Sequence, residues 1–196
     1  MKRRRFVQST LAAGLITSPV GKVLAEQKTL VKTPQDFEGP YYPRGSRHKT
    51  NDLIRAKPRS KVLYFRGNVA NIRGEPSPGA LVDIWQTDRL GRYNHPRDSS
   101  PGARWDDFLY WGEATTDQKG DFQFRTYVPG AYAPRPAHIH YKVWSNRQLL
   151  LTSQIYFAEL GGTKGQSKLP RFGDLQTARL VEIGDGALET NFQVVV

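Results

Sequence analysis

The chain consists of short apolar runs separated by turn residues, and this pattern limits its fold more than any other feature. No long stretch repeats apolar residues at the helical period of 3.6. Phe122 and Phe124 instead alternate with polar neighbours, as residues do in a strand with one buried face. Further strand-like runs cover residues 61–72, 80–86, 108–116, 137–145, 149–157, 178–183 and 189–196. About eight short strands with turns between them predict an all-β fold, an antiparallel β-sandwich.

The segments between the predicted strands supply turns and loops. Asp-Gln-Lys-Gly at residues 117–120 predicts a tight turn, and Gly-Asp-Gly at residues 184–186 predicts the turn of a hairpin. Two longer loops cover residues 88–107 and 159–176. Because loops held on a rigid sandwich commonly carry function, we expect these long loops to contribute to an active site.

The first 25 residues differ in character from the rest of the chain. A basic start at residues 2–5 precedes a mildly apolar stretch, residues 6–20, which is too short to cross a membrane. Val-Leu-Ala at residues 23–25 has the small-residue ending that signal peptidase accepts. These features predict an export signal that leaves no stable membrane anchor on the mature protein.

The run from Arg3 to Gln8 resembles a twin-arginine signal, although a basic, frayed N-terminus would look similar. We therefore expect export to the periplasm or beyond the cell by the twin-arginine route. After removal of residues 1–25, an extended, proline-punctuated arm would cover residues 26–60. A single β-sandwich domain would cover residues 61–196.

Cysteine is absent from the chain, which excludes disulfide bonds, thiolate metal sites and cysteine nucleophiles. Any metal would therefore take its protein ligands from His, Tyr, Asp or Glu. The formal net charge is +11, but residues 1–25 contribute five basic residues and no acidic ones. The remainder holds 24 Lys and Arg against 18 Asp and Glu, without a basic run interleaved with aromatics. We therefore expect no binding to nucleic acid.

Two of the four histidines, His138 and His140, lie in one predicted strand. Residues two apart in a strand point to the same face, so these two imidazoles could bind one metal. Imidazole suits iron, copper and zinc alike, and the same spacing also occurs in proteins that bind no metal. His48 and His95 lie in turn-rich stretches, and we expect both at the surface.

Further ligands would have to be oxygen donors, and Tyr93 and Tyr132 lie in turn-rich segments before the histidine pair. A free tyrosine is a neutral phenol at pH 7, because its pKa is about 10. A bound ferric ion favours the phenolate, and two phenolates with one hydroxide would balance its three charges. Either tyrosine taken alone is more simply a core or surface ring, since the chain has nine.

Several linked motifs resemble those of the intradiol ring-cleavage dioxygenases, the family of protocatechuate 3,4-dioxygenase and catechol 1,2-dioxygenase. The matching segments follow the order of that family over roughly residues 34–157. They are residues 38–42 (Glu-Gly-Pro-Tyr-Tyr), 80–86 (Ala-Leu-Val-Asp-Ile-Trp-Gln), 91–93 (Gly-Arg-Tyr), 117–120, 124–126, 129–132 (Pro-Gly-Ala-Tyr), 135–140 (Arg-Pro-Ala-His-Ile-His) and 153–157 (Ser-Gln-Ile-Tyr-Phe).

The resemblance implies a non-haem Fe(III) held by Tyr93, Tyr132, His138 and His140. It makes Tyr132 and His140 the axial pair and places the other two equatorially. Tyr132 would also take a proton from the substrate, and Arg135 would steady negative charge on the substrate ring. The implied reaction opens a catechol-type aromatic with O2 between its two hydroxyl-bearing carbons, giving a cis,cis-muconate-type product.

The same resemblance suggests roles for three further residues. Gln154 matches a glutamine behind the metal ligands, and Tyr41 and Tyr42 lie where the wall of the substrate pocket begins.

Two features of the sequence depart from the best-known members of that family. Only five residues separate Tyr132 from His138, so we expect a more open site or a bulkier substrate. The arm before residue 60 is too short for the helical dimerisation domain of the catechol and hydroxyquinol enzymes.

Two alternatives remain open from the sequence. The chain could be a non-catalytic exported β-sandwich that serves as a binding module. It could also hold zinc or copper through His138 and His140 alone. Members of the family commonly assemble, which leaves a homo-oligomer open as well.

Overall fold

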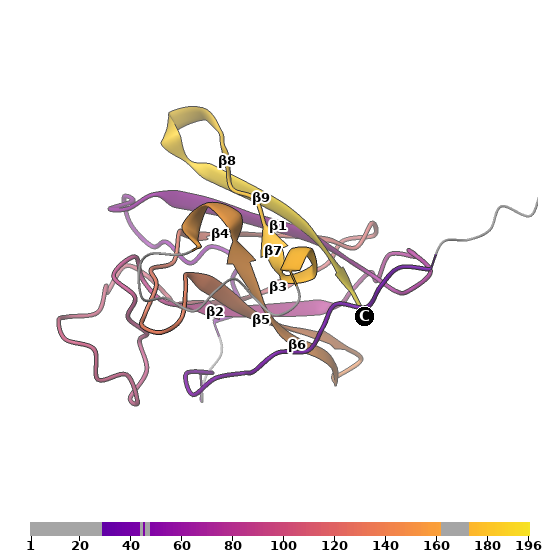
Figure 1. Ribbon diagram of the computed structural model, residues 1–196, viewed down its shortest axis with the longest axis horizontal. Coiled ribbons are helices and arrows are strands. Elements are labelled where there is room, and N and C mark those ends of the chain that lie inside the picture. Colours follow the sequence, from indigo (N-terminus) through magenta and orange to yellow (C-terminus); the bar gives the residue numbers. More distant parts are fainter. Residues whose placement is uncertain (1–28, 44, 46–47, 162–172) are drawn as a thin grey trace, which may run out of the picture.

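Two β-sheets packed face to face form the protein in this computed structural model (Figure 1). The structure describes residues 29–43, 45, 48–161 and 173–196. The predicted export signal lies outside these residues and stays a prediction. Within the described part of the chain, no helix has the length and apolar character needed to cross a membrane.

The first sheet has four strands in the order β4-β1-β9-β8. They are β4 (Asp121–Tyr127), β1 (Val62–Ala70), β9 (Leu188–Val195) and β8 (Val181–Glu182). The second sheet has five strands in the order β3-β2-β5-β6-β7. They are β3 (Trp111–Thr115), β2 (Leu81–Gln86), β5 (His138–Ser145), β6 (Gln148–Phe157) and β7 (Thr177–Ala178). Three short 3-10 helices complete the described elements: η1 (Ala158–Leu160), η2 (Gly173–Gln176) and η3 (Gly184–Gly186).

The predicted β-sandwich is confirmed, and the predicted turn at residues 117–120 and hairpin at residues 184–186 both form. Most strand pairs are antiparallel, but β1 pairs with β9 and β6 pairs with β7 in parallel. The sequence pattern did not predict these two pairings. Alternation of apolar residues identifies a strand and its buried face, but it does not identify the strand's partner.

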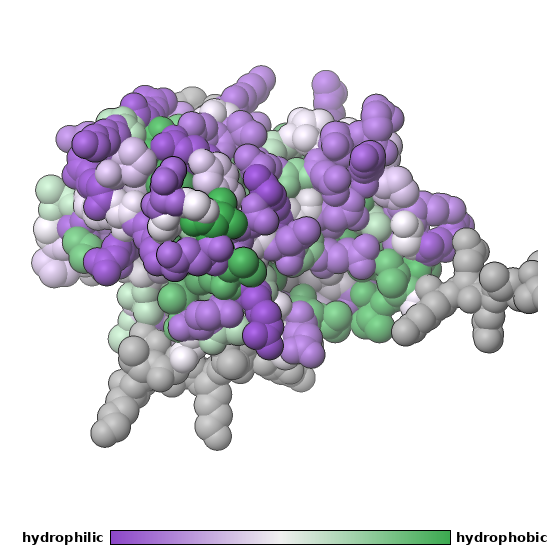
Figure 2. Space-filling view, turned by 90° about the horizontal axis from the view of Figure 1, so that it is seen from above, coloured by the Kyte–Doolittle hydropathy of each residue, from purple (hydrophilic) through white to green (hydrophobic). Residues whose placement is uncertain are grey.

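The main core lies between the two sheets and is rich in aromatic rings. Leu63, Phe65 and Val69 alternate along β1 with half-buried residues, as the period of two requires. Gly67 leaves space for the rings that face it, because a Cβ there would lie 2.6 Å from Phe122 Cζ. Figure 2 shows the face above β8 and β9, where hydrophilic residues dominate and apolar residues form small separate patches.

A second, smaller core lies on the outer face of the five-stranded sheet. Its buried residues are Trp85, Tyr93 and Trp111, and Tyr41, Tyr42 and Tyr132 pack against it. The arm before β1 covers this face, running along β5 and β6 as the indigo trace in Figure 1. Asp36 N donates to Thr152 O at 2.9 Å, and Gln154 Nε2 donates to Phe37 O at 2.7 Å.

The later part of the arm closes one open edge of the sandwich. Glu113 N in β3 donates to Thr50 O at 3.0 Å, and Arg125 N in β4 donates to Asn51 O at 2.8 Å. Leu53 N then donates back to Arg125 O at 2.8 Å. The arm thus joins the edge strand of one sheet to the edge strand of the other and satisfies backbone groups that an edge would leave unpaired.

Candidate metal centre

Four aromatic rings from three separate stretches of chain meet on the outer face of the five-stranded sheet. Their centroids form a closed circuit: Tyr93–Tyr132 5.6 Å, Tyr132–His138 5.6 Å, His138–His140 4.7 Å and His140–Tyr93 6.4 Å. Tyr93, His138 and His140 are at most 3% exposed, and Tyr132 is partly exposed. The structure therefore brings together all four residues that the sequence singled out as candidate ligands.

The two histidines project from β5 on the same face, as their spacing predicted. Their Nε2 atoms lie 3.1 Å apart. His138 Nδ1 lies 2.7 Å from Pro136 O, so Nδ1 carries the proton and the Nε2 lone pair points toward His140. Burial, together with Arg135, lowers the pKa of His138 to about 4. Burial and the neighbouring His138 hold the pKa of His140 well below its usual range, so both imidazoles are in the neutral form that binds metals.

This arrangement fits a metal ion. Two ligands about 2.1 Å from one metal and at right angles to each other lie about 3.0 Å apart, which agrees with the 3.1 Å between the Nε2 atoms. Tyr93 Oη is buried and makes no hydrogen bond of ordinary geometry to a described residue. Burial, with Tyr132 nearby, raises the pKa of Tyr93 well above 10, so its phenolate form would require a strong positive charge.

The backbone of Tyr93 is held on both sides by the long loop that follows β2. Its N–H donates to Asp98 Oδ2 at 2.5 Å, and Arg104 Nε donates to its carbonyl oxygen at 2.5 Å. Burial opposes ionisation of Asp98, but its hydrogen bonds from Ser100 and Tyr93 and the Arg104 charge lower its pKa overall. This anion and this cation therefore hold the tyrosine from either side.

A tight turn places Tyr132 next to Arg135. Tyr132 N donates to Arg135 O at 3.1 Å, and Arg135 N donates to Tyr132 O at 2.6 Å. These two bonds close a four-residue turn with Pro134 at its third position, and the peptide bond between Ala133 and Pro134 is cis. Ala133 and Pro134 are exposed. The short Tyr132–His138 segment is thus a compact turn, and it adds no long wall beside the four rings.

Arg135 belongs to a hydrogen-bonded group with two residues of β6. Its Nη2 donates to Gln154 Oε1 and, at 2.6 Å, to Tyr156 Oη. Tyr156 Oη in turn donates to Gln154 Oε1 at 2.8 Å. Strand register places Gln154 opposite His140 and Tyr156 opposite His138. Tyr156 had no predicted role, although its spacing from Gln154 puts both residues on one face of the strand.

Trp85 is a second residue that our sequence reasoning did not assign to the site. Its ring stacks on His140 at 4.8 Å with an interplanar angle of 7°. Register explains the contact, because Trp85 in β2 pairs with His140 in β5. The signal was present in the alternation of residues 81–86, which puts Trp85 on the outer face. The sequence pattern does not show that β2 lies beside β5, and it therefore could not predict that Trp85 meets His140.

Tyr41 and Tyr42 lie on different sides of the four rings. Tyr41 stacks on Tyr93 at 4.5 Å and meets Tyr132 edge-on at 6.1 Å. Tyr42 lies beyond Trp85, and its hydroxyl donates to Asp83 Oδ2 at 2.9 Å. Of the two pocket candidates, Tyr41 is therefore the one in contact with candidate ligands.

We expected His95 to be an ordinary surface residue, and this prediction was wrong. Its side chain is partly buried, and its ring lies 5.8 Å from that of Tyr41. The turn that carries Tyr93 returns toward the arm and brings His95 beside the site. His48 is exposed, as expected.

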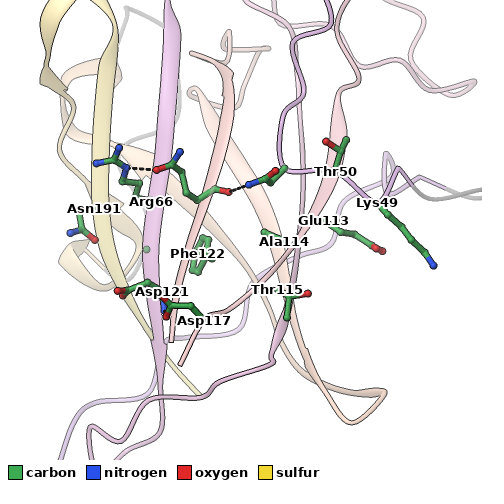
Figure 3. Close-up of a pocket in the computed structure, with 13 residues that line it drawn as sticks. Lys49, Thr50, Arg66, Glu113, Ala114, Thr115, Asp117, Asp121, Phe122 and Asn191 are labelled. Carbon is green, nitrogen blue, oxygen red and sulfur yellow. Dashed lines mark hydrogen bonds between the residues drawn. The ribbon is translucent and has the colours of Figure 1, made fainter. Parts of the chain in front are cut away.

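A separate cleft lies between the edge strands β3 and β4, beside the part of the arm that joins them (Figure 3). Its volume is about 590 Å³. Lys49, Arg66, Glu113 and Asp121 are among the residues that line it. None of the residues predicted to form a catalytic or metal site lines this cleft. Its charges are of both signs, and Arg66 Nε donates to Gln123 Oε1 at 2.6 Å.

Residues 37–161 match the family model for dioxygenases, which is more than half of the chain. The chain is 32% identical over 115 residues to the protocatechuate 3,4-dioxygenase beta chain of Burkholderia cepacia. It is also 32% identical over 144 residues to the chlorocatechol 1,2-dioxygenase of Pseudomonas putida. The chain belongs to the intradiol ring-cleavage dioxygenase family.

This intradiol dioxygenase chain spans about half the length of the curated relatives it matches. The Burkholderia alignment covers 55% of the chain and 49% of that protein, and the Pseudomonas alignment covers 62% and 52%. Among solved structures, it resembles the dioxygenase domain of a dioxygenase and carbohydrate-binding protein fusion from Streptomyces sp. SirexAA-E. That comparison has a TM-score of 0.69 and 28% identity, and covers 85% of this chain and 98% of the other.

Proposed function

We propose that the protein is a non-haem Fe(III)-dependent intradiol dioxygenase. It would open a catechol-type aromatic between the two hydroxyl-bearing carbons, with both atoms of O2 entering a cis,cis-muconate-type diacid. Membership of the family supports the class of reaction. The observation that carries the proposal is the closed circuit of two phenol and two imidazole rings.

The donor set supports iron over other metals. Imidazoles alone would suit iron, copper or zinc, whereas phenolates are hard, anionic donors that favour a trivalent ion. Bound Fe(III) would withdraw electron density from a chelated catechol and so make its ring reactive toward O2. Tyr93, Tyr132, His138 and His140 would hold the ion, and the protein would also orient the substrate and shield it from water.

Tyr132 is the better placed of the two tyrosines to accept a proton. A catechol must lose two protons before both of its oxygens can act as ligands. Tyr132 is partly exposed and can meet an incoming substrate, whereas Tyr93 is 3% exposed and clamped at its backbone. Tyr132 Oη would therefore take and hold one substrate proton, and the hydroxide that balances the charge of the site would take the other and leave as water, while Tyr93 keeps its position.

Arg135 would stabilise negative charge that develops on the substrate ring. A cation fixed in advance stabilises such charge without having to reorganise during the reaction. Gln154 and Tyr156 hold the guanidinium in this way. Tyr41, stacked on Tyr93, would form part of the pocket wall.

The decisive experiment combines a visible spectrum, metal analysis and oxygen uptake on the purified mature chain. Tyrosinate-to-Fe(III) charge transfer should colour the protein red-brown, and a panel of catechols under air should consume O2 and yield a muconate. Tyr93→Phe should lose most of the colour and the turnover. A colourless protein that contains zinc or copper, or a Tyr93→Phe protein that keeps both properties, would contradict the proposal.

We also propose that residues 1–25 direct export through the twin-arginine route, on the basis of their sequence pattern. Replacing Arg3 and Arg4 by lysine should leave the protein in the cytoplasm. Cell fractionation followed by detection of the chain measures this. Undiminished export of the double variant would contradict the twin-arginine assignment.

A further inference from the structure

Asp88, two residues beyond the end of β2, organises the turn that leads to Tyr93. Its side chain is fully buried. One carboxylate oxygen accepts from Nε and Nη2 of Arg92 at 2.9 and 2.7 Å, and the other accepts from the backbone N–H groups of Leu90 and Arg92 at 2.8 and 3.2 Å. Asp88 N also donates to Arg92 O at 2.9 Å. Because Arg92 directly precedes Tyr93, this closed turn fixes the position of the Tyr93 backbone.

The same stretch also holds the segment that carries Tyr132. Gly130 N donates to Asp88 O at 2.8 Å, and Thr87 Oγ1 donates to Gly130 O at 2.8 Å. Both backbone polar groups of Gly130, two residues before Tyr132, are thus bound by adjacent residues. A Cβ on Gly130 would lie 2.3 Å from Arg89 O, so the two segments pack backbone against backbone.

A third contact joins Asp88 to the far end of the long loop. Tyr110 Oη donates to Asp88 Oδ2 at 3.2 Å and accepts from Trp105 N at 2.8 Å. Burial raises the pKa of Tyr110 to about 12, so the hydroxyl stays protonated and able to donate. The loop that contains Tyr93 is therefore tied at its start and at its end to one buried carboxylate.

We propose that Thr87 and Asp88 are positioning residues that set the separation between Tyr93 and Tyr132, and thereby the affinity of the site for its metal. This inference rests on the proposed function. Neither residue is among the four rings; Asp88 acts through Arg92 and Gly130, and Thr87 acts through Gly130 alone. A merely structural role would affect unfolding without changing how tightly the folded protein holds the ion.

The test compares two threonines with the same chemistry. Thr87→Val removes the hydroxyl that binds Gly130 O while keeping the shape of the side chain. Thr116→Val is the control: Thr116 is also buried, and its Oγ1 donates to Ser77 O at 2.7 Å and accepts from Ala80 N at 2.9 Å, so this substitution removes at least as much hydrogen bonding as Thr87→Val. Thr116 lies beside Ala80 at the opposite end of β2, roughly 20 Å from Thr87 along the strand.

Asp88→Asn provides a stronger perturbation of the same network. It keeps the size of the side chain but leaves the buried Arg92 without its counter-charge, which can prevent folding. The pair of threonine variants therefore decides the question. Circular dichroism and thermal unfolding of the iron-free proteins establish which variants are folded before any metal is added.

The readouts are the rate of iron loss to an excess of chelator and the position of the tyrosinate charge-transfer band. Thr87→Val should lose iron about five-fold faster than the wild type, which corresponds to one hydrogen bond, and its band should shift. Folded Asp88→Asn should lose iron at least about ten-fold faster, as is typical when a partner behind a ligand is removed. Thr116→Val should match the wild type in both measurements, even if it is equally destabilised.

Equal iron loss from Thr87→Val and Thr116→Val, with unshifted bands, would overturn the positioning role while leaving the proposed function intact. Wild-type protein that binds no iron and shows no band would overturn both proposals. The two failures are therefore distinguishable in the same experiment.

Discussion

Arg135 shows at the scale of one residue how the site combines charge with fixed geometry. Its guanidinium reaches Gln154 and Tyr156 together, which a lysine amine on a flexible stem does less well. We expect Arg135→Lys to lower kcat by about 10- to 100-fold, and Arg135→Gln to lower it further because the charge is lost. Oxygen uptake under saturating catechol measures this.

The visible spectrum provides the control for the Arg135 variants. Because Arg135 is not one of the four candidate ligands, the charge-transfer band should persist in both variants. Loss of the band in parallel with kcat would show that Arg135 maintains the metal site itself, and would contradict a role confined to the substrate.

Gly91 is a position at which both the backbone conformation and a close contact require glycine. Its φ is +77°, and a Cβ there would lie 2.2 Å from Ala131 O. We expect Gly91→Ala to cost at least about 2 kcal/mol, since the positive φ alone costs about 1–2 kcal/mol and the clash adds to it. Denaturant unfolding of the iron-free protein measures this free energy.

Gly79→Ala is the matched control, because Gly79 has a φ of +73° and open space around its missing Cβ. It should show only the cost of the backbone conformation, about 1–2 kcal/mol. If the two alanine variants were equally stable, the close packing of the tyrosine-bearing segments would not contribute as argued.

At the scale of elements, β5 is buried on both faces, unlike a strand whose second face meets water. Ile139, Tyr141 and Val143 enter the main core, and His138 and His140 lie on the outer face under the arm and loops. Covering that face shields the histidines from water and keeps them neutral. The arm is thus part of the site, although its described residues form no strand of either sheet.

An ion pair ties the arm to β5. Lys142 Nζ, nearly buried, lies 2.6 Å from Glu38 Oε2 and 3.5 Å from the centre of the Tyr42 ring. We expect Glu38→Gln to lower the free energy of unfolding, because it removes the carboxylate that faces the buried Lys142 ammonium. The expected loss is only about 1 kcal/mol, because Glu38 itself is about half exposed and water screens the pair. Denaturant unfolding at low and high salt measures this.

Glu75→Gln serves as the control for the arm variant. Glu75 pairs with Arg73 at 2.8 Å, but both side chains are exposed. Loss of this exposed ion pair should leave the unfolding midpoint unchanged. Equal effects of the two substitutions would indicate that the arm is not held by this pair.

At the scale of the whole molecule, the compact turn from Tyr132 to Arg135 leaves one side of the four rings without a long wall. We expect the protein to accept catechols with a bulky substituent para to one hydroxyl, with kcat/KM within about ten-fold of that for catechol. Oxygen uptake with a series of 4-alkyl and 4-aryl catechols measures this. A steep fall of kcat/KM with substituent size would show that another segment closes the pocket.

The sequence alone determined most of the strands, the turns at residues 117–120 and 184–186, and the face shared by His138 and His140. The predicted strand at residues 178–183 was wrong as a single element, because Thr177–Ala178 and Val181–Glu182 belong to different sheets. These features depend on alternation and on local turn chemistry, so a few neighbouring residues are sufficient to specify them. The resemblance to the dioxygenases then selected Tyr93 and Tyr132 from nine tyrosines. Local pattern gave no reason to prefer them, because either could have been an ordinary packed ring.

Only the tertiary structure decided which segments meet. The placement of β2 beside β5 stacks Trp85 on His140, and β6 beside β5 brings Tyr156 to Arg135. The return of the loop after β2 brings His95 to the arm. These contacts join residues distant in sequence, and they follow from strand pairing and close backbone packing, which an alternating pattern leaves unspecified.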